Sequence, residues 1–323
     1  MRTKLNLNLV GGTLTILLAL AAHSSPAVVV SPSQASLSCI THGQGKFVAV
    51  GPAGSVLTST NGLDWLRQAV PRKVHLRGVA CGDGLFIAVG DQGEVLTSRD
   101  AVEWVRAVSA TTNTLRHVTH SCGQFVAVGD GGTIVTSFEG SRWRRVESDT
   151  ASSLRSVVYG GGRFVSVGAD GAIVTSAGGH KRWTRVPPDT EGCLRGIAYG
   201  SGLFVAVSPN RAVLTSPDGR NWTRHSLGLT AYPYAVAFTG SKFVAVGCAG
   251  ALLCSTDGVR WERLPSEASC CLTGLAGSED QILAVGATGV VRVATSRPMR
   301  TGLTSRLIRE QAWDAGRDAG HAK

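Results

Sequence analysis

Phe204-Val205-Ala206-Val207 is one of seven copies of a short apolar stretch, and the spacing of these copies decides the fold. Successive copies begin 39, 39, 39, 40, 39 and 39 residues apart. One regular period of about 40 residues indicates an array of identical supersecondary units rather than two unrelated domains. The copies begin at Phe47, Phe86, Phe125, Phe164, Phe204, Phe243 and Ile282.

The second copy shows the repeat unit most clearly. Short apolar runs alternate with turns such as Gly82-Asp83-Gly84, because glycine tolerates a positive φ. Four short antiparallel strands in about 40 residues are typical of one propeller blade. The sequence therefore predicts an all-β fold, a seven-bladed β-propeller of four-stranded antiparallel blades. In this copy the expected strands are residues 76–81, 86–89, 95–98 and 104–106.

Residue size changes from the first to the fourth expected strand of each unit. Blades converge at the axis of a propeller, and the first strands carry Gly78, Gly196 and Gly274. Blades diverge at the rim, where a large aromatic side chain buries much area. We therefore expect the tryptophans of the fourth strands to be core residues. They are Trp65, Trp104, Trp143, Trp183, Trp222 and Trp261.

The two ends of the chain depart from the repeat. Residues 1–25 combine a positive start, an apolar run and small residues, as in a secretory signal peptide, which predicts a secreted or periplasmic protein. Residues 26–298 form the predicted propeller, and residues 299–323 form a C-terminal tail with room for a short helix. The seventh unit lacks a fourth strand with Trp. The repeat places Ala27-Val28-Val29-Val30 there, so we expect this N-terminal strand to close the ring.

The composition favours binding over any particular reaction. A net charge of +10 favours an acidic protein or an anionic polymer as partner. No pattern indicates sequence-specific nucleic-acid binding, and no segment is apolar for long enough to span a membrane. We expect a monomer, and we predict no catalytic residue, cofactor or metal site.

Four arginines stand one residue after the first-strand leucine of consecutive units: Arg77, Arg116, Arg155 and Arg195. The other units carry Ser38, Tyr234 and Thr273 there. Strand direction places this position at the same end of the ring as the turns with Asp91, Asp130 and Asp170. One interpretation is an anion-binding surface, because a guanidinium presents a forked donor to carboxylate or phosphate. The other is that each arginine pairs with a nearby Asp or carbonyl and ties blades together.

Other polar residues carry weaker signals. Tyr232 and Tyr234 break the repeat and are candidates for the mouth of the channel. His117 and His120 are three apart on an expected strand, so their side chains point to opposite faces and do not favour a metal site. An arginine two residues after each Trp suggests a structural role at the rim.

Eight cysteines in a chain expected to be exported permit disulfides. Cys248 falls in the turn between the second and third strands of unit six. Cys270 and Cys271 fall in the adjacent connection at the same end. We therefore predict a disulfide between Cys248 and either Cys270 or Cys271.

The turn before the fourth strand repeats as Ser59-Thr60-Asn61-Gly62-Leu63-Asp64-Trp65, with similar copies at 216–222 and 255–261. These turns resemble the Asp-box (BNR-type) turns of Asp-box β-propellers, over about residues 27–298. In such turns Asp or Asn accepts backbone N–H bonds and Gly supplies the left-handed position. The resemblance implies turns that are structural and lie away from the ligand face.

Two groups of propellers give two hypotheses of function. The stretch Gly129-Asp130-Gly131-Gly132-Thr133-Ile134-Val135-Thr136-Ser137 resembles photosystem II assembly/stability factor-like proteins, which implies an exported, non-enzymatic binding or assembly scaffold with an arginine-rich face for an acidic partner. Resemblance to sialidase-superfamily propellers implies the alternative, a carbohydrate-active hydrolase with its site at the channel mouth, involving Tyr232 or Tyr234. We expect the scaffold rather than the enzyme.

Overall fold

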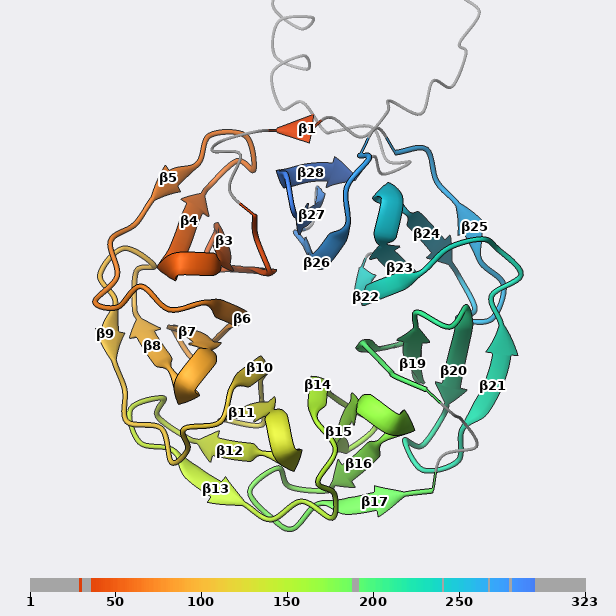
Figure 1. The fold of residues 1–323 in the computed structure, drawn as a ribbon, viewed down its shortest axis with the longest axis horizontal. Helices are drawn as coiled ribbons and strands as arrows, with labels where there is room; N and C mark the ends of the chain where they lie inside the picture. Colours follow the sequence, from red (N-terminus) through yellow and green to blue (C-terminus); the bar gives the residue numbers. More distant parts are fainter. Residues whose placement is uncertain are drawn as a thin grey trace, which may run out of the picture.

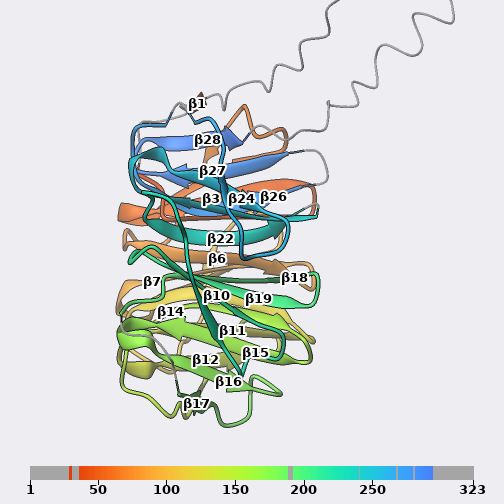
Figure 2. The same ribbon diagram turned by 90° about the vertical axis from the view of Figure 1, so that its right-hand side faces the viewer.

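Seven four-stranded antiparallel sheets stand around a central axis in the computed structural model. The structure describes residues 29–30, 36–187, 192–239, 241–266, 268–278 and 281–293. The expected signal peptide and C-terminal tail lie outside these ranges. Figure 1 shows the ring viewed down its axis, and Figure 2 shows it from the side. The prediction of a seven-bladed β-propeller is confirmed.

The first strand of each blade lies nearest the axis and the fourth forms the rim (Figure 1). The first four blades contain β2 (Cys39–Gly43), β3 (Lys46–Gly51), β4 (Ser55–Ser59) and β5 (Leu66–Arg67); β6 (Leu76–Gly82), β7 (Leu85–Gly90), β8 (Val95–Ser98) and β9 (Val105–Arg106); β10 (Leu115–Ser121), β11 (Gln124–Gly129), β12 (Ile134–Ser137) and β13 (Arg144–Val146); and β14 (Leu154–Gly160), β15 (Arg163–Gly168), β16 (Ile173–Ser176) and β17 (Thr184–Val186).

The last three blades follow the same order. They contain β18 (Gly196–Gly200), β19 (Leu203–Ser208), β20 (Ala212–Ser216) and β21 (Thr223–Ser226); β22 (Pro233–Thr239), β23 (Lys242–Gly247), β24 (Leu252–Ser255) and β25 (Glu262–Arg263); and β26 (Leu272–Gly277), β27 (Ile282–Gly286) and β28 (Gly289–Val293), with β1 (Val29–Val30). In five blades a single 3₁₀ turn joins the second strand to the third: η1 (Pro52–Gly54), η2 (Asp91–Gly93), η3 (Asp130–Gly132), η4 (Ala169–Gly171) and η5 (Cys248–Gly250).

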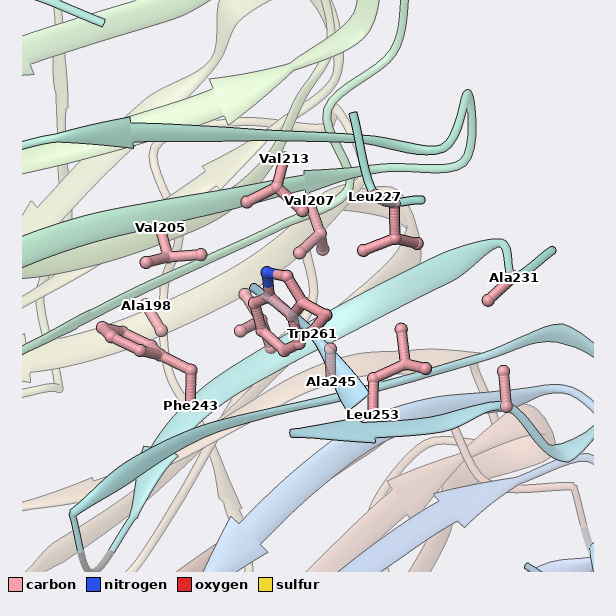
Figure 3. Packing of buried hydrophobic residues seen from close by; sticks show 12 residues of the cluster. Ala198, Val205, Val207, Val213, Leu227, Ala231, Phe243, Ala245, Leu253 and Trp261 are labelled. Atoms are coloured by element: carbon pink, nitrogen blue, oxygen red, sulfur yellow. The ribbon is translucent and has the colours of Figure 1, made fainter. Parts of the chain in front are cut away.

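The apolar second strands form the core because both of their faces pack against neighbouring blades. All six phenylalanines at the start of the repeat are fully buried or nearly so. Figure 3 shows one such boundary, where Phe243 and Trp261 of blade six meet Val205 and Val213 of blade five. Burial of a side chain of this size contributes roughly 1.5–3 kcal/mol. Similar apolar clusters join the other neighbouring blades.

Glycine in the first strand lets neighbouring blades approach at the axis. A Cβ added to Gly78 would lie 2.9 Å from the Cα of His117 in the next blade. A Cβ on Gly274 of blade seven would lie 3.0 Å from the Cα of Cys39 in blade one. No larger residue fits at such a separation without a shift of the backbone, so the small residues here have the wedge role expected from the sequence.

The turns before the fourth strands have the hydrogen bonds expected of Asp-box chemistry. Asn61 Oδ1 accepts the backbone N–H groups of Leu63 and Asp64 at 2.8 and 2.9 Å. Ser59 Oγ accepts the N–H of Gly62, which has φ +71°. The indole of Trp65 donates to the carbonyl of Gly62 at 3.2 Å. In five blades the turn thus fixes the rim tryptophan that follows it.

The N-terminal strand β1 lies beside β28 at the outer edge of blade seven (Figure 1). Val29 pairs with Val291 and Val30 with Val290, in antiparallel register. The repeat spacing predicts an N-terminal strand at this position. That the strand is needed to close the ring stays a prediction. None of the described residues belongs to a helix with the length and apolar character of a membrane span.

Candidate functional site

The four sequence-predicted arginines Arg77, Arg116, Arg155 and Arg195 define one end of the ring, here called the arginine face. This end is held together by a repeated backbone bond. In five blades the first residue of the turn between the second and third strands donates to the carbonyl just before the first strand, as Asp91 N does to His75 O at 2.9 Å and Asp130 N to Thr114 O at 3.0 Å. The arginine position and the 3₁₀ turns therefore do lie at the same end of the blade.

Arg77 and Arg116 are engaged by carboxylates of their own blades. Arg77 Nε and Nη2 donate to Asp91 at 2.5 and 3.2 Å, and Arg116 makes the same two bonds to Asp130 at 2.5 and 2.9 Å. The hydrogen bond from Arg77 is the largest cause that holds the pKa of Asp91 below its usual value. Bidentate pairs of this kind fix the orientation of both side chains. These two arginines therefore pair with a nearby Asp, as the second interpretation expected, but each pair lies within one blade.

Asp130 lies between two of the arginines. Desolvation raises the pKa of its carboxyl, but the hydrogen bonds from Arg116 and Ser153 and the charges of Arg116 and Arg155 outweigh it, so the pKa is lowered. Asp130 thus offsets part of the charge of Arg155, which belongs to the next blade.

Arg155 has no matching carboxylate in its own blade. The residue that corresponds to Asp91 and Asp130 is Ala169, and Asp170 stands one place later. The carboxylate of Asp170 accepts instead from Ser152 Oγ at 3.1 Å. Arg155 Nε is buried and has no hydrogen-bond partner among the described residues. The sequence grouped Asp170 with the other two aspartates, and the structure separates it because Asp170 stands at the second position of the turn rather than the first.

Arg195 differs again, because an aromatic ring takes the place of a carboxylate. Its guanidinium lies over the ring of Tyr234, 4.6 Å from the centroid, across the boundary between blades five and six. The corresponding turn position in blade five is Pro209, which offers no side-chain acceptor. Arg195 is exposed. Stacking leaves the edge of a guanidinium free to donate, so this group can still bind an anion.

A second arginine–tyrosine pair lies next to the first, and the sequence analysis missed its arginine. Arg211 Nη2 donates to Tyr232 Oη at 2.8 Å, and the guanidinium lies 5.1 Å from the ring centroid. Arg211 stands where other blades carry glycine, such as Gly132 and Gly171, and has φ +57°. A side chain in this left-handed region costs about 1 kcal/mol. The sequence shows this departure from the repeat, and the departure could have identified Arg211 as a candidate site residue.

The two predicted tyrosines are therefore both brought to the boundary between blades five and six. Tyr234 is the second residue of the innermost strand of blade six and is half-buried, while Tyr232 is exposed in the connection before this strand. Together Arg195, Arg211, Tyr232 and Tyr234 form what we call the paired sector of the arginine face. The phenol of each tyrosine contacts Arg211 or Cys248 rather than a glutamate.

Cys248 and Cys271 adjoin the paired sector. Their Sγ atoms are 2.9 Å apart, and both cysteines are free thiols in this structure. Cys248 Sγ also lies 2.9 Å from Tyr234 Oη, which raises the pKa of Tyr234. Cys270 contacts Thr288 Oγ1 at 3.0 Å instead. Of the two partners left open by the sequence, Cys271 is the one that the fold places against Cys248.

The histidines and the rim arginines have local partners. His117 Nδ1 accepts the N–H of Val157 at 3.4 Å, and His120 Nε2 lies 3.0 Å from Asp83. At the rim, Arg67 donates to Ser55 Oγ at 3.1 Å. Across the part of the chain that the structure describes, no three His, Cys, Asp or Glu side chains gather as metal ligands would.

Solved structures with the same fold are numerous, and three show its range. The chain is similar to YCF48 bound to D1 peptide, with TM-score 0.70 and 18% identity over 84% of this chain and 96% of that chain. It is similar to YCF48 from Cyanidioschyzon merolae, with TM-score 0.68 and 17% identity over 83% and 98% of the two chains. It is also similar to virginiamycin B lyase from Staphylococcus aureus, with TM-score 0.72 and 12% identity over 83% and 98%.

These likenesses show the seven-bladed fold alone, because proteins of this fold share it across many unrelated functions. No family model and no curated protein matches the sequence. Membership of the Asp-box family therefore stays a prediction, although the turns have the hydrogen bonds that such membership implies.

Proposed function

We propose that this protein is a non-enzymatic binding or assembly scaffold that acts after export and receives an acidic segment of a partner protein on its arginine face. The observation that carries the proposal is the difference between the four arginines. Arg77 and Arg116 are held by carboxylates of their own blades, whereas Arg155 and Arg195 have no such carboxylate at the matching positions. Arg211 adds a further cation beside Arg195.

The chemistry of the paired sector suits a peptide. Tyrosine rings offer large, rigid contact area at small entropic cost, and arginines donate to carboxylates in a fork. Among proteins of this fold, one structure is of YCF48 bound to a D1 peptide, which supports a peptide as the class of ligand. The net charge of +10 would speed the approach of an acidic partner.

The hydrolase alternative finds less support. Most glycosidases need two carboxyl groups on either side of the scissile bond, and sialidases use a tyrosine nucleophile instead. On the arginine face, Asp91 and Asp130 are bound by arginines, and both tyrosine hydroxyls contact groups other than glutamate. No observation in the described residues favours glycoside hydrolysis.

The test is the binding of a fluorescein-labelled decaglutamate peptide, followed by anisotropy at several salt concentrations. We expect Arg155→Gln with Arg195→Gln to weaken binding at least tenfold, and the further change of Arg77 and Arg116 to abolish it. The matched control is Arg224→Ser with Arg263→Ser, which removes the same charge from exposed rim positions.

If the arginine-face variant and the rim control lose affinity equally, net charge alone drives binding and the proposed face is wrong.

Export is tested separately. Fusion of residues 1–25 to a reporter that is active only outside the cytoplasm should give activity, and a silent reporter contradicts that part of the proposal.

A further inference from the structure

A second basic site lies on the rim between blades four and five. A cavity of about 480 Å³ opens there, within the range of small-ligand sites. Five of the side chains around it are cationic, and the others described are neutral: the cations are Arg163, Lys181, Arg182, Arg185 and Arg220. Arg182 also lies 3.5 Å from Asp149 in an exposed ion pair. We call this cavity the rim pocket.

Arg163 departs from the structural role of its repeat position. In blades one, three and seven the residue before the buried aromatic or Ile donates to a carbonyl in the next blade's turn. Gln124 Nε2 donates to Gly178 O at 3.1 Å, and Lys46 Nζ donates to Asp100 O at 2.9 Å. Arg163 packs against the equivalent turn, since a Cβ on Gly219 would lie 3.1 Å from its Cδ. Its Nε is nevertheless buried without a hydrogen-bond partner among the described residues.

A second donor at the same blade boundary is also unsatisfied. In five blades the rim tryptophan donates to a carbonyl of its own turn, as Trp261 does to Gly258 at 3.1 Å. Trp222, the equivalent residue in blade five, has a buried Nε1 with no partner in the described residues. A buried donor without an acceptor costs about 1–3 kcal/mol. Arg163 lines the basic cavity whereas Trp222 does not, so the buried Nε of Arg163 is the donor that indicates an acceptor from outside the chain in this cavity.

Repulsion among the cations also favours an anion in the rim pocket. A cavity of this volume is about 10 Å across, which is comparable with the Debye length of about 8 Å at physiological salt. Four of the five cations are exposed, so salt screens the more distant pairs, and repulsion remains between the nearer ones. An anion bound in the pocket would relieve that repulsion and accept from the guanidinium of Arg163.

We propose that the rim pocket binds a compact ligand with two or more negative charges on phosphate or sulfate groups. Arg163 and Arg220 approach it from the two blades and clamp the ligand between them. The pocket does not include any residue of the arginine face, so it is a separate site that does not depend on the proposed function.

The experiment is calorimetric titration of the full chain with inorganic tripolyphosphate and, in a parallel arm, with sucrose octasulfate. We expect one site, and we expect Arg163→Gln and Arg220→Ser each to weaken binding at least tenfold. Both variants should fold, because blade three carries Gln124 and Ser141 at the same repeat positions. Binding of only one probe would identify phosphate or sulfate as the source of the anion.

The matched control is Lys242→Gln, which removes one charge at the repeat position of Arg163 in blade six. Its affinity should equal that of the unchanged chain, and so should that of the Arg155→Gln, Arg195→Gln variant. In a thermal melt, each probe that binds should raise the midpoint of the unchanged chain but not that of Arg163→Gln. Absence of binding to both probes, or equal loss in Lys242→Gln, overturns the proposal.

Discussion

Gln281 Nε2 donates to the carbonyl of Asn61 at 3.1 Å, and so joins blade seven to blade one across 220 residues of sequence. The same boundary contains the hydrogen bond from Thr273 Oγ1 to Leu37 O at 3.1 Å. It also has its own apolar core, to which Phe47 and Leu283 contribute. Side-chain hydrogen bonds and apolar packing therefore join the last blade to the first.

Replacement of Gln281 by leucine should lower the free energy of unfolding by about 0.5–1.5 kcal/mol, the usual net contribution of one hydrogen bond. Leucine should fit, because blades two and five carry Leu85 and Leu203 at this repeat position. Urea denaturation of the two chains measures the difference. An equal midpoint in both would mean that this bond contributes nothing to closure.

Removal of the N-terminal strand should lower the thermal midpoint by several degrees. Val29 and Val30 pair with the outer edge of β28, and without them that edge is unpaired. The comparison is between chains that begin at residue 26 and at residue 32, followed by circular dichroism. If the shorter chain melts at the same temperature, closure does not need this strand.

Phe204→Ala should lower the free energy of unfolding by about 3–5 kcal/mol, because it leaves a cavity in a tightly packed boundary. Phe204 is fully buried, whereas Phe138 is 59% exposed. Phe138→Ala is therefore the control, with an expected change within about 0.5 kcal/mol. Chemical denaturation of both variants decides whether the repeated aromatic contributes as a core residue.

His117 should make stability fall with pH below neutrality. Desolvation lowers the pKa of His117 from 6.5 to about 4, so between these values the unfolded chain binds a proton that the native chain does not. The native state is therefore destabilised as pH falls from about 6.5 to about 4, by at most about 3 kcal/mol.

His117→Ser removes this effect and should be tolerated, because blade four carries Ser156 at the same position. Between pH 7 and pH 4.5 the variant should lose less stability than the unchanged chain. Parallel losses in both chains, measured by thermal melts, would show that other groups dominate the acid response.

Cys248 and Cys271 should form a disulfide when the protein is treated with oxidised glutathione. The two thiols give up two protons and two electrons, and the glutathione disulfide is reduced to two thiols. Peptide mapping should find Cys248 linked to Cys271, because their sulfur atoms are already 2.9 Å apart. Linkage of Cys248 to Cys270, or eight free thiols after treatment, would contradict the expectation.

Much of the fold could be predicted because each blade repeats a local pattern. Phe164 belongs to a second strand, Gly62 to a turn and Trp183 to the rim. The role of each residue follows from its repeat position, because every blade packs against blades of the same kind. The candidate site was less predictable because it depends on pairs from different blades. Arg195 meets Tyr234 and Arg211 meets Tyr232 only after adjacent connections have folded side by side.

The sequence by itself determined the number of blades, the order of strands and the residues at the axis and the rim, because regular periodicity and steric size act locally. Only the tertiary structure decided which arginines are neutralised. Asp130 reaches Arg116 while Asp170 does not reach Arg155, since a shift of one residue in a tight turn redirects the side chain. The stretch Phe204-Val205-Ala206-Val207 itself lies in the core of the ring, so function depends on positions at which the blades differ.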